Sequence, residues 1–116
     1  MPTWEEVVAS ATRFPGVEVS TSFGTPSIKV GKRFLGRLRS DPDALVLKTT
    51  DMQEREALLA GQPEVFFTIP HYDGYPAVLI HLDRIAPELL AELVEDAWRT
   101  YALKKHLAAH AAAGCL

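Results

Sequence analysis

Residues 27–49 read SIKVGKRFLGRLRSDPDALVLKT, three apolar-rich segments divided by two turn signals. The pair Gly31-Lys32 predicts a tight hairpin of type II′, because glycine stands at the first of the two central positions. Asp41-Pro42-Asp43 predicts the second turn, since these residue types favour turns. Strands joined by such short connections have to be antiparallel neighbours. The three expected strands are Ser27–Val30, Arg33–Ser40 and Ala44–Thr49.

The segment before this region predicts one helix and one more strand. Thr3 and Glu6 have the spacing of a capping box, and apolar residues then recur at helical spacing until Pro15-Gly16. From Val17 to Phe23 apolar or threonine side chains alternate with polar ones, which is typical of a half-buried strand. The chain therefore begins with an amphipathic helix followed by a strand.

The segment after it predicts two helices and two further strands. Asp51 and Glu54 repeat the capping signature at the start of a short helix. The apolar runs Val65–Ile69 and Ala77–Leu82 indicate strands, and Pro87 suits the first turn of a long amphipathic helix. After this helix the chain becomes rich in alanine.

Helices at both ends have to bury their apolar stripes, which favours a two-layer α+β fold with helices packed on one face of a mainly antiparallel sheet. Alternation along the strands assigns side chains to the two faces. The face against the helices is expected to carry Ile28, Val30, Phe34, Leu38, Leu45 and Leu47. The opposite face is expected to carry Lys29, Arg33, Arg37, Arg39 and Lys48.

Length and composition favour a single domain in the cytoplasm. The chain has 116 residues, of which 47% are apolar, enough for one core. It has no apolar run near the roughly 20 residues that cross a bilayer and no signal-peptide pattern at its start, so no membrane partner is expected. One cysteine, Cys115, excludes an internal disulfide and a cysteine-based metal site.

Short aromatic, glycine and proline motifs follow one another in a distinctive order. They are Trp4, Phe14-Pro15-Gly16, Phe23-Gly24-Thr25-Pro26, Lys32-Arg33-Phe34, Pro70-His71-Tyr72-Asp73-Gly74-Tyr75-Pro76 and Ala97-Trp98-Arg99. In this order they resemble the MmcQ/YjbR-like family of small bacterial proteins, from about Trp4 to Leu107. We therefore divide the chain into an MmcQ/YjbR-like domain at residues 1–107 and an alanine-rich tail at residues 108–116.

The resemblance implies a frataxin-like (CyaY-like) α+β fold with helices on one face of an antiparallel sheet. It adds little about chemistry. Members of the family commonly carry a DNA-binding label, based largely on a structural likeness to a double-wing arrangement, and many are uncharacterised.

A concentration of cations suggests nucleic acid, DNA in particular, as a partner. The net charge is −3, but six of the twelve lysines and arginines lie between residues 28 and 50. These candidate phosphate ligands are Lys29, Lys32, Arg33, Arg37, Arg39 and Lys48. On this hypothesis charge reversal of Arg37 and Arg39 abolishes binding. The alternative is a charged face that only keeps an exposed sheet in solution.

The aromatic loop at residues 70–76 is the second candidate site. It joins two expected strands and carries His71, Tyr72 and Tyr75. These rings can stack on a nucleobase, a small ligand or a protein partner, or they can plug the end of the core. A homodimer through an exposed strand edge is a further alternative.

Metal binding and catalysis have weaker signals. His106 and His110 stand four residues apart, but in an alanine-rich segment without an acidic neighbour. In the frataxin family, which this fold resembles, iron handling is associated with an acidic ridge. The first helix of this chain offers only two acidic residues for such a ridge, Glu5 and Glu6. Nucleotide-binding glycine loops and a serine elbow are missing from the sequence. We therefore predict a non-enzymatic protein without catalytic residues, metal or cofactor, in which the lone His81 is a half-buried strand residue.

Overall fold

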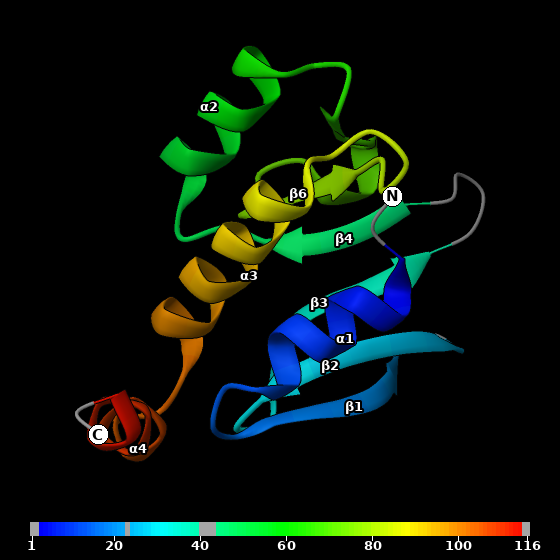
Figure 1. Ribbon diagram of the computed structural model, residues 1–116. Helices are drawn as coiled ribbons and strands as arrows, with labels where there is room; N and C mark the ends of the chain where they lie inside the picture. Colours follow the sequence, from blue (N-terminus) through cyan, green and yellow to red (C-terminus); the bar gives the residue numbers. More distant parts are fainter. Residues whose placement is uncertain (1–2, 23, 40–43, 115–116) are drawn as a thin grey trace.

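Six strands form one antiparallel sheet in the computed structural model, which describes residues 3–22, 24–39 and 44–114 (Figure 1). The strands follow the order β1-β2-β3-β4-β6-β5. Their bounds are β1 Val17–Ser22, β2 Thr25–Val30, β3 Arg33–Arg39, β4 Ala44–Lys48, β5 Phe66–Phe67 and β6 Ala77–Ile80. The expected turn at Asp41-Pro42-Asp43 lies outside the described residues.

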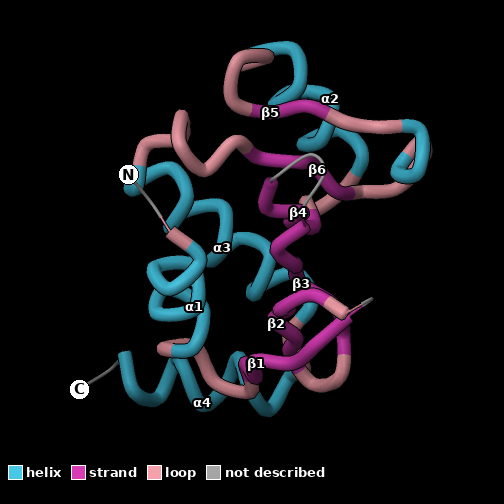
Figure 2. Tube along the Cα trace, turned by 90° about the vertical axis from the view of Figure 1, so that its right-hand side faces the viewer, coloured by secondary structure: helices cyan, strands magenta, loops and turns pink. Residues whose placement is uncertain are grey.

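The helices form the second layer, which confirms the predicted α+β class. Their bounds are α1 Trp4–Thr12, α2 Met52–Gly61, α3 Pro87–Tyr101 and α4 Lys104–Gly114, with a 3₁₀ helix η1 at Pro70–Tyr72. Helices α1 and α3 lie together on one side of the strands, as the turned view shows (Figure 2). Helix α2 contacts β5 and β6 at the far edge of the sheet (Figure 1).

Both predicted N-caps are present. The Glu6 amide donates to Thr3 Oγ1 at 3.3 Å. The Glu54 amide donates to Asp51 Oδ1 at 2.8 Å, while the Glu54 carboxylate accepts from the amide of Thr50 instead of that of the cap residue. Each cap satisfies an amide that the first helical turn leaves without a backbone partner.

The main core lies between the helices and the sheet. Ile28, Val30, Leu45 and Leu47 are buried in it, as predicted. Trp98 of α3 is also fully buried there. Helix α3 thus buries the apolar stripe that its sequence predicts.

A bulge in β3 changes the face of Phe34. Ile28 pairs with Gly36 but Lys29 pairs with Phe34, so Leu35 is an extra residue in β3. A bulge shifts the alternation of side chains along its strand. Leu35 therefore enters the main core, whereas Phe34 packs on the opposite face. The prediction that Phe34 faces the helices was wrong for this reason.

The β2–β3 hairpin has a different turn type from the predicted one. Its central residues Gly31 and Lys32 have φ angles of 53° and 73°. Two positive φ angles define a type I′ turn, whereas type II′ has one at the first position only. A type I′ turn matches the right-handed twist of the flanking strands, and it requires a positive φ at both central residues. Lys32 therefore has a left-handed backbone conformation although it is not glycine.

The face of the sheet away from α1 and α3 is apolar over β4 and β6. Val46 and Leu79 are buried there beneath Tyr72 of η1, in a second cluster that Phe34 and Phe67 border. This face is therefore charged mainly along β2 and β3, and the aromatic loop covers the remainder. His81 lies half-buried, as predicted, with its ring 4.4 Å from that of Phe67, but it follows β6, which ends at Ile80, and is not part of the strand.

Helix α4 runs across residue 107, where the sequence places the end of the domain. His110 packs its ring 5.3 Å from Phe14 and 5.1 Å from Trp98. Gly16, with a φ of 79°, lies so close to His106 that a Cβ there would stand 2.5 Å from the imidazole. The two histidines are thus packing residues. Cys115 lies outside the described residues.

Among the described residues, no three His, Cys, Asp or Glu side chains are grouped so that they could hold a metal ion. Within the same ranges of the chain, every helix is too short or too polar to cross a membrane.

Candidate binding cleft

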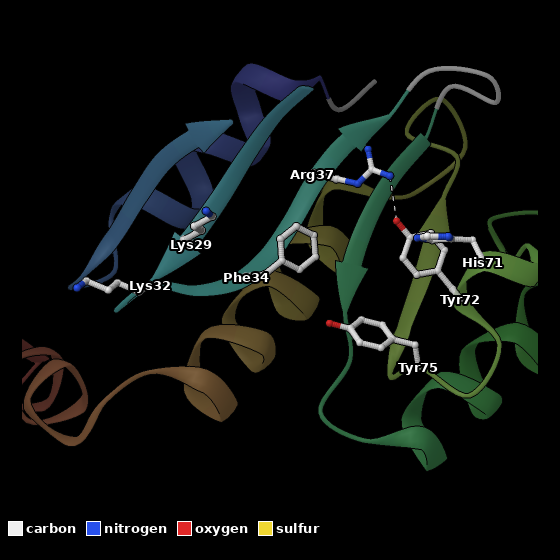
Figure 3. Close-up of a pocket in the computed structure, with 7 residues that line it drawn as sticks. All are labelled: Lys29, Lys32, Phe34, Arg37, His71, Tyr72 and Tyr75. Carbon is white, nitrogen blue, oxygen red and sulfur yellow. Dashed lines mark hydrogen bonds between the residues drawn. The ribbon is translucent and has the colours of Figure 1, made fainter. Parts of the chain in front are cut away.

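A cleft of about 370 Å³ opens on the sheet face that α1 and α3 leave uncovered (Figure 3). Strands β2 and β3 and their hairpin form one side, and the loop that contains η1 forms the other. The lining residues are Lys29, Lys32, Phe34, Arg37, His71, Tyr72 and Tyr75. The cleft therefore joins the basic strands and the aromatic loop, which the sequence presents as two separate candidate sites.

Arg37 links the two sides of the cleft. One guanidinium nitrogen, Nη2, donates to the Tyr72 hydroxyl at 3.1 Å, and Nη1 donates to Thr25 Oγ1 at 3.2 Å. Arg37 is only 8% exposed and Tyr72 only 7%. The predicted phosphate ligand Arg37 thus lies buried as a structural tie, and Tyr72 takes the plugging role that was one of the two alternatives for the loop.

His71 and Tyr75 remain exposed at the cleft. The His71 ring stands edge-on to Tyr72, with 4.8 Å between centroids. Tyr75 is 40% exposed, and Lys48 Nζ lies 5.3 Å from its ring centroid. Lys48 also lies 4.2 Å from the ring centroid of Tyr101. Lys48 therefore lies beside Tyr75 and outside the lining of the cleft.

The other cations that the sequence singles out divide between two places. Arg39 lines an adjoining hollow of about 290 Å³ together with Arg37, Ile69 and His71. Arg33 instead donates from Nη1 to the carbonyl of Tyr101 at 3.2 Å, at the end of α3. Three of the six candidate phosphate ligands line the cleft, one lines its neighbour, and Arg33 and Lys48 line neither.

Among the residues that the structure describes, the cleft lining contains three cations and no carboxylate. In the sheet register Lys29 pairs with Glu18 of β1. Lys32 is exposed in the hairpin turn, and Lys29 is partly exposed on β2. Because water and salt screen exposed charges, these lysines attract an anion most strongly when it sits in the concave surface beside them.

Arg55 of α2 holds the loop from behind. Its Nε donates to the carbonyl of Ala77 at 3.1 Å, and its Nη2 donates to Thr68 Oγ1 at 3.0 Å and to the carbonyl of Tyr72 at 3.4 Å. These acceptors lie before, within and after the loop. Arg55 is not among the residues predicted from the sequence, although its position three and four residues before Leu58 and Leu59 puts it on their helix face.

Tyr101 connects α3 to the end of β4. Its hydroxyl donates to the carbonyl of Thr49 at 2.6 Å. Burial raises the pKa of Tyr101 above the usual value for tyrosine, and the nearby Tyr75, Glu54 and Asp51 raise it further. The phenol thus stays protonated and keeps donating when ordinary tyrosines begin to ionise.

A pH dependence follows from this raised pKa. The unfolded chain ionises first, near pH 10, so the stabilisation by Tyr101 is complete below that pH and is lost as the pH rises through the folded-state pKa. We expect Tyr101→Phe to lower the free energy of unfolding by about 1 kcal/mol at pH 7.5. When the pH rises from 7.5 to 10.5, the variant should lose less of this free energy than the native protein does. Urea unfolding of both proteins at the two pH values measures this. If the native protein and the variant lost the same free energy of unfolding between pH 7.5 and 10.5, this pH dependence would not come from Tyr101.

The comparisons with known proteins agree with the fold. A family model described as YjbR matches residues 12–100. Uncharacterised proteins of Mycobacterium tuberculosis and Mycobacterium bovis are 40% identical over 83 residues, which cover 69% of this chain and 64% of each relative. The crystal structure of Deinococcus radiodurans protein DR2400, with the domain DUF419, matches with a TM-score of 0.74 at 24% identity, covering 91% of this chain and 86% of that one.

Proposed function

The chain belongs to the YjbR family, as its motif order predicts, and we propose that it binds nucleic acid through the cleft between β2–β3 and the η1 loop. The observation that carries this proposal is the lining itself. Lys29 and Lys32 stand on one side of a concave surface, and the exposed rings of His71 and Tyr75 stand on the other. Lysines bind phosphates and aromatic rings bind bases, so this surface suits both parts of a nucleotide.

The proposal is for binding without catalysis. The described part of the lining supplies cations and aromatic rings, with no carboxylate or thiol that could form an acid–base or nucleophile pair with His71. The cytoplasmic location and the homodimer stay predictions.

The size of the cleft favours a second candidate function. At about 370 Å³ it falls in the range of roughly 300–1,000 Å³ that is usual for small-ligand sites. A small aromatic anion would use the same lysines and rings. The two candidate functions differ in how affinity and its salt dependence change with the length of the ligand. A chain of phosphates releases more counterions on binding than a single anion does.

Charge reversal at the exposed lysines tests the nucleic-acid proposal. Arg37 is unsuitable because its burial would confound lost charge with lost structure. We expect Lys29→Glu/Lys32→Glu to weaken binding of labelled DNA at least tenfold and to lower the salt slope by about 2, or about 1 for each lost phosphate contact. Fluorescence anisotropy at low and physiological salt measures both quantities.

Arg13→Glu/Arg99→Glu is the matched control. It makes the same change in net charge with exposed residues of the helical layer, and we expect it to leave the affinity within about twofold. An unchanged affinity in the lysine variant, or an equal loss in the control, would refute the cleft as the site. No binding at low salt would refute the function and direct attention to small anions.

A further inference from the structure

We propose that the cleft accepts an unpaired base, so that its ligand is single-stranded nucleic acid and not duplex; this inference rests on the proposed function. The placement of the aromatic rings supports this inference. Phe34 projects from β3, and the exposed Tyr75 comes from the loop after β5, so aromatic rings from two separate segments face one concave space (Figure 3). In a duplex the base faces are covered by neighbouring bases, and only an unpaired base can present its face to such rings.

The accessible rings are held in place before a ligand arrives. The loop is tied to β3 through Tyr72 and Arg37, and to α2 through Arg55. Lys48 lies against the Tyr75 ring at 5.3 Å. Phe34 is half-buried against the second apolar cluster. Binding therefore requires little ordering of these side chains, which preserves the favourable free energy of stacking.

The surface of the cleft continues into the adjoining hollow. The cleft and the adjoining hollow share Arg37 and His71, and the hollow adds Arg39. A flexible strand can thus run from Lys32 at the hairpin, past Phe34, to the hollow beside Arg39. A single strand can follow this curved path between strands and loop, whereas a stiff duplex bends only at a cost in free energy.

The experiment compares a labelled ten-nucleotide thymidine strand with the same strand paired to its adenosine complement. We expect the single strand to bind at least tenfold more tightly. Tyr75→Ala should weaken single-strand binding about tenfold, since loss of one base–ring stack has an effect of this size, and should leave duplex binding unchanged. Tyr75→Phe, which keeps the ring, should stay within about twofold of the native protein.

Phe34→Leu provides a second test, since leucine keeps an apolar side chain against the cluster but removes the ring. A thermal melt checks that the variant is folded, and its single-strand affinity should fall while its duplex affinity does not. Equal affinity for both forms, with Tyr75→Ala and Phe34→Leu neutral and Lys29→Glu/Lys32→Glu still harmful, would overturn this inference and leave nucleic-acid binding standing. Absence of binding to either form would overturn both.

Discussion

Replacing Arg55 with methionine is expected to lower the free energy of unfolding by about 3–5 kcal/mol, because each buried acceptor left without a donor costs about 1–3 kcal/mol. Methionine keeps an unbranched stem in a site where Arg55 is 5% exposed, but it donates no hydrogen bond. The carbonyls of Ala77 and Tyr72 and the hydroxyl of Thr68 would lose their donor. Urea unfolding followed by circular dichroism measures the change.

The matched control is Glu56→Gln. Arg55 Nη1 donates to Glu56 Oε1 at 2.6 Å, but the Glu56 side chain is 62% exposed. Exposed ion pairs contribute little, so this control should cost less than about 1 kcal/mol. If Arg55→Met cost no more than Glu56→Gln, the buried hydrogen bonds would not be what holds the loop.

The effect on the cleft distinguishes Arg55 from an ordinary core residue. The loop that it ties carries His71 and Tyr75, so folded Arg55→Met protein should also bind nucleic acid less tightly than the native protein. Anisotropy at a temperature well below the melting point of the variant tests this. An unchanged affinity would mean that the tie to Arg37 alone positions the loop.

Replacing Trp98 with alanine is the second large effect that we expect, again about 3–5 kcal/mol of lost stability. Trp98 is fully buried and stacks on Phe14 with 4.8 Å between ring centroids. Its Nε1 donates to the carbonyl of Pro15 at 2.9 Å. Alanine would leave a cavity among α1, α3 and α4 and an unpaired carbonyl. Urea unfolding measures the loss.

Trp98→Phe separates these contributions. Phenylalanine keeps an aromatic ring beside Phe14 but cannot donate to Pro15, so a smaller loss of about 1–2 kcal/mol is expected. Because Trp98 lies on the helical side of the sheet, the folded fraction of either variant should bind nucleic acid with native affinity. A variant that was stable but bound weakly would show that the helical layer shapes the cleft.

Local features of the chain could be predicted because their causes lie within a few residues. A cap at Thr3 needs only the amide of Glu6, and the hairpin needs only Gly31-Lys32 between two apolar segments. The strand expected at Val65–Ile69 is limited to Phe66–Phe67 in the structure. Its length depends on pairing with Ile80 and Leu79 of β6, which lie outside the segment itself. Element type thus followed from the sequence more closely than element length.

By itself, the sequence determined the α+β class, the order of the six strands and of helices α1, α2 and α3, the apolar stripe of α3, and the residue types available for binding, whereas helix α4 was not predicted. Only the tertiary structure decided that Leu35 takes the core position expected of Phe34, because a bulge depends on the register with the partner strand. Tertiary pairing of β4 with β6 also brought the basic strands and the aromatic loop to one cleft. Contacts between residues far apart in the chain buried Arg37 but left Lys32 exposed and Lys29 partly exposed, since a polar group loses solvent only where its partners can replace water.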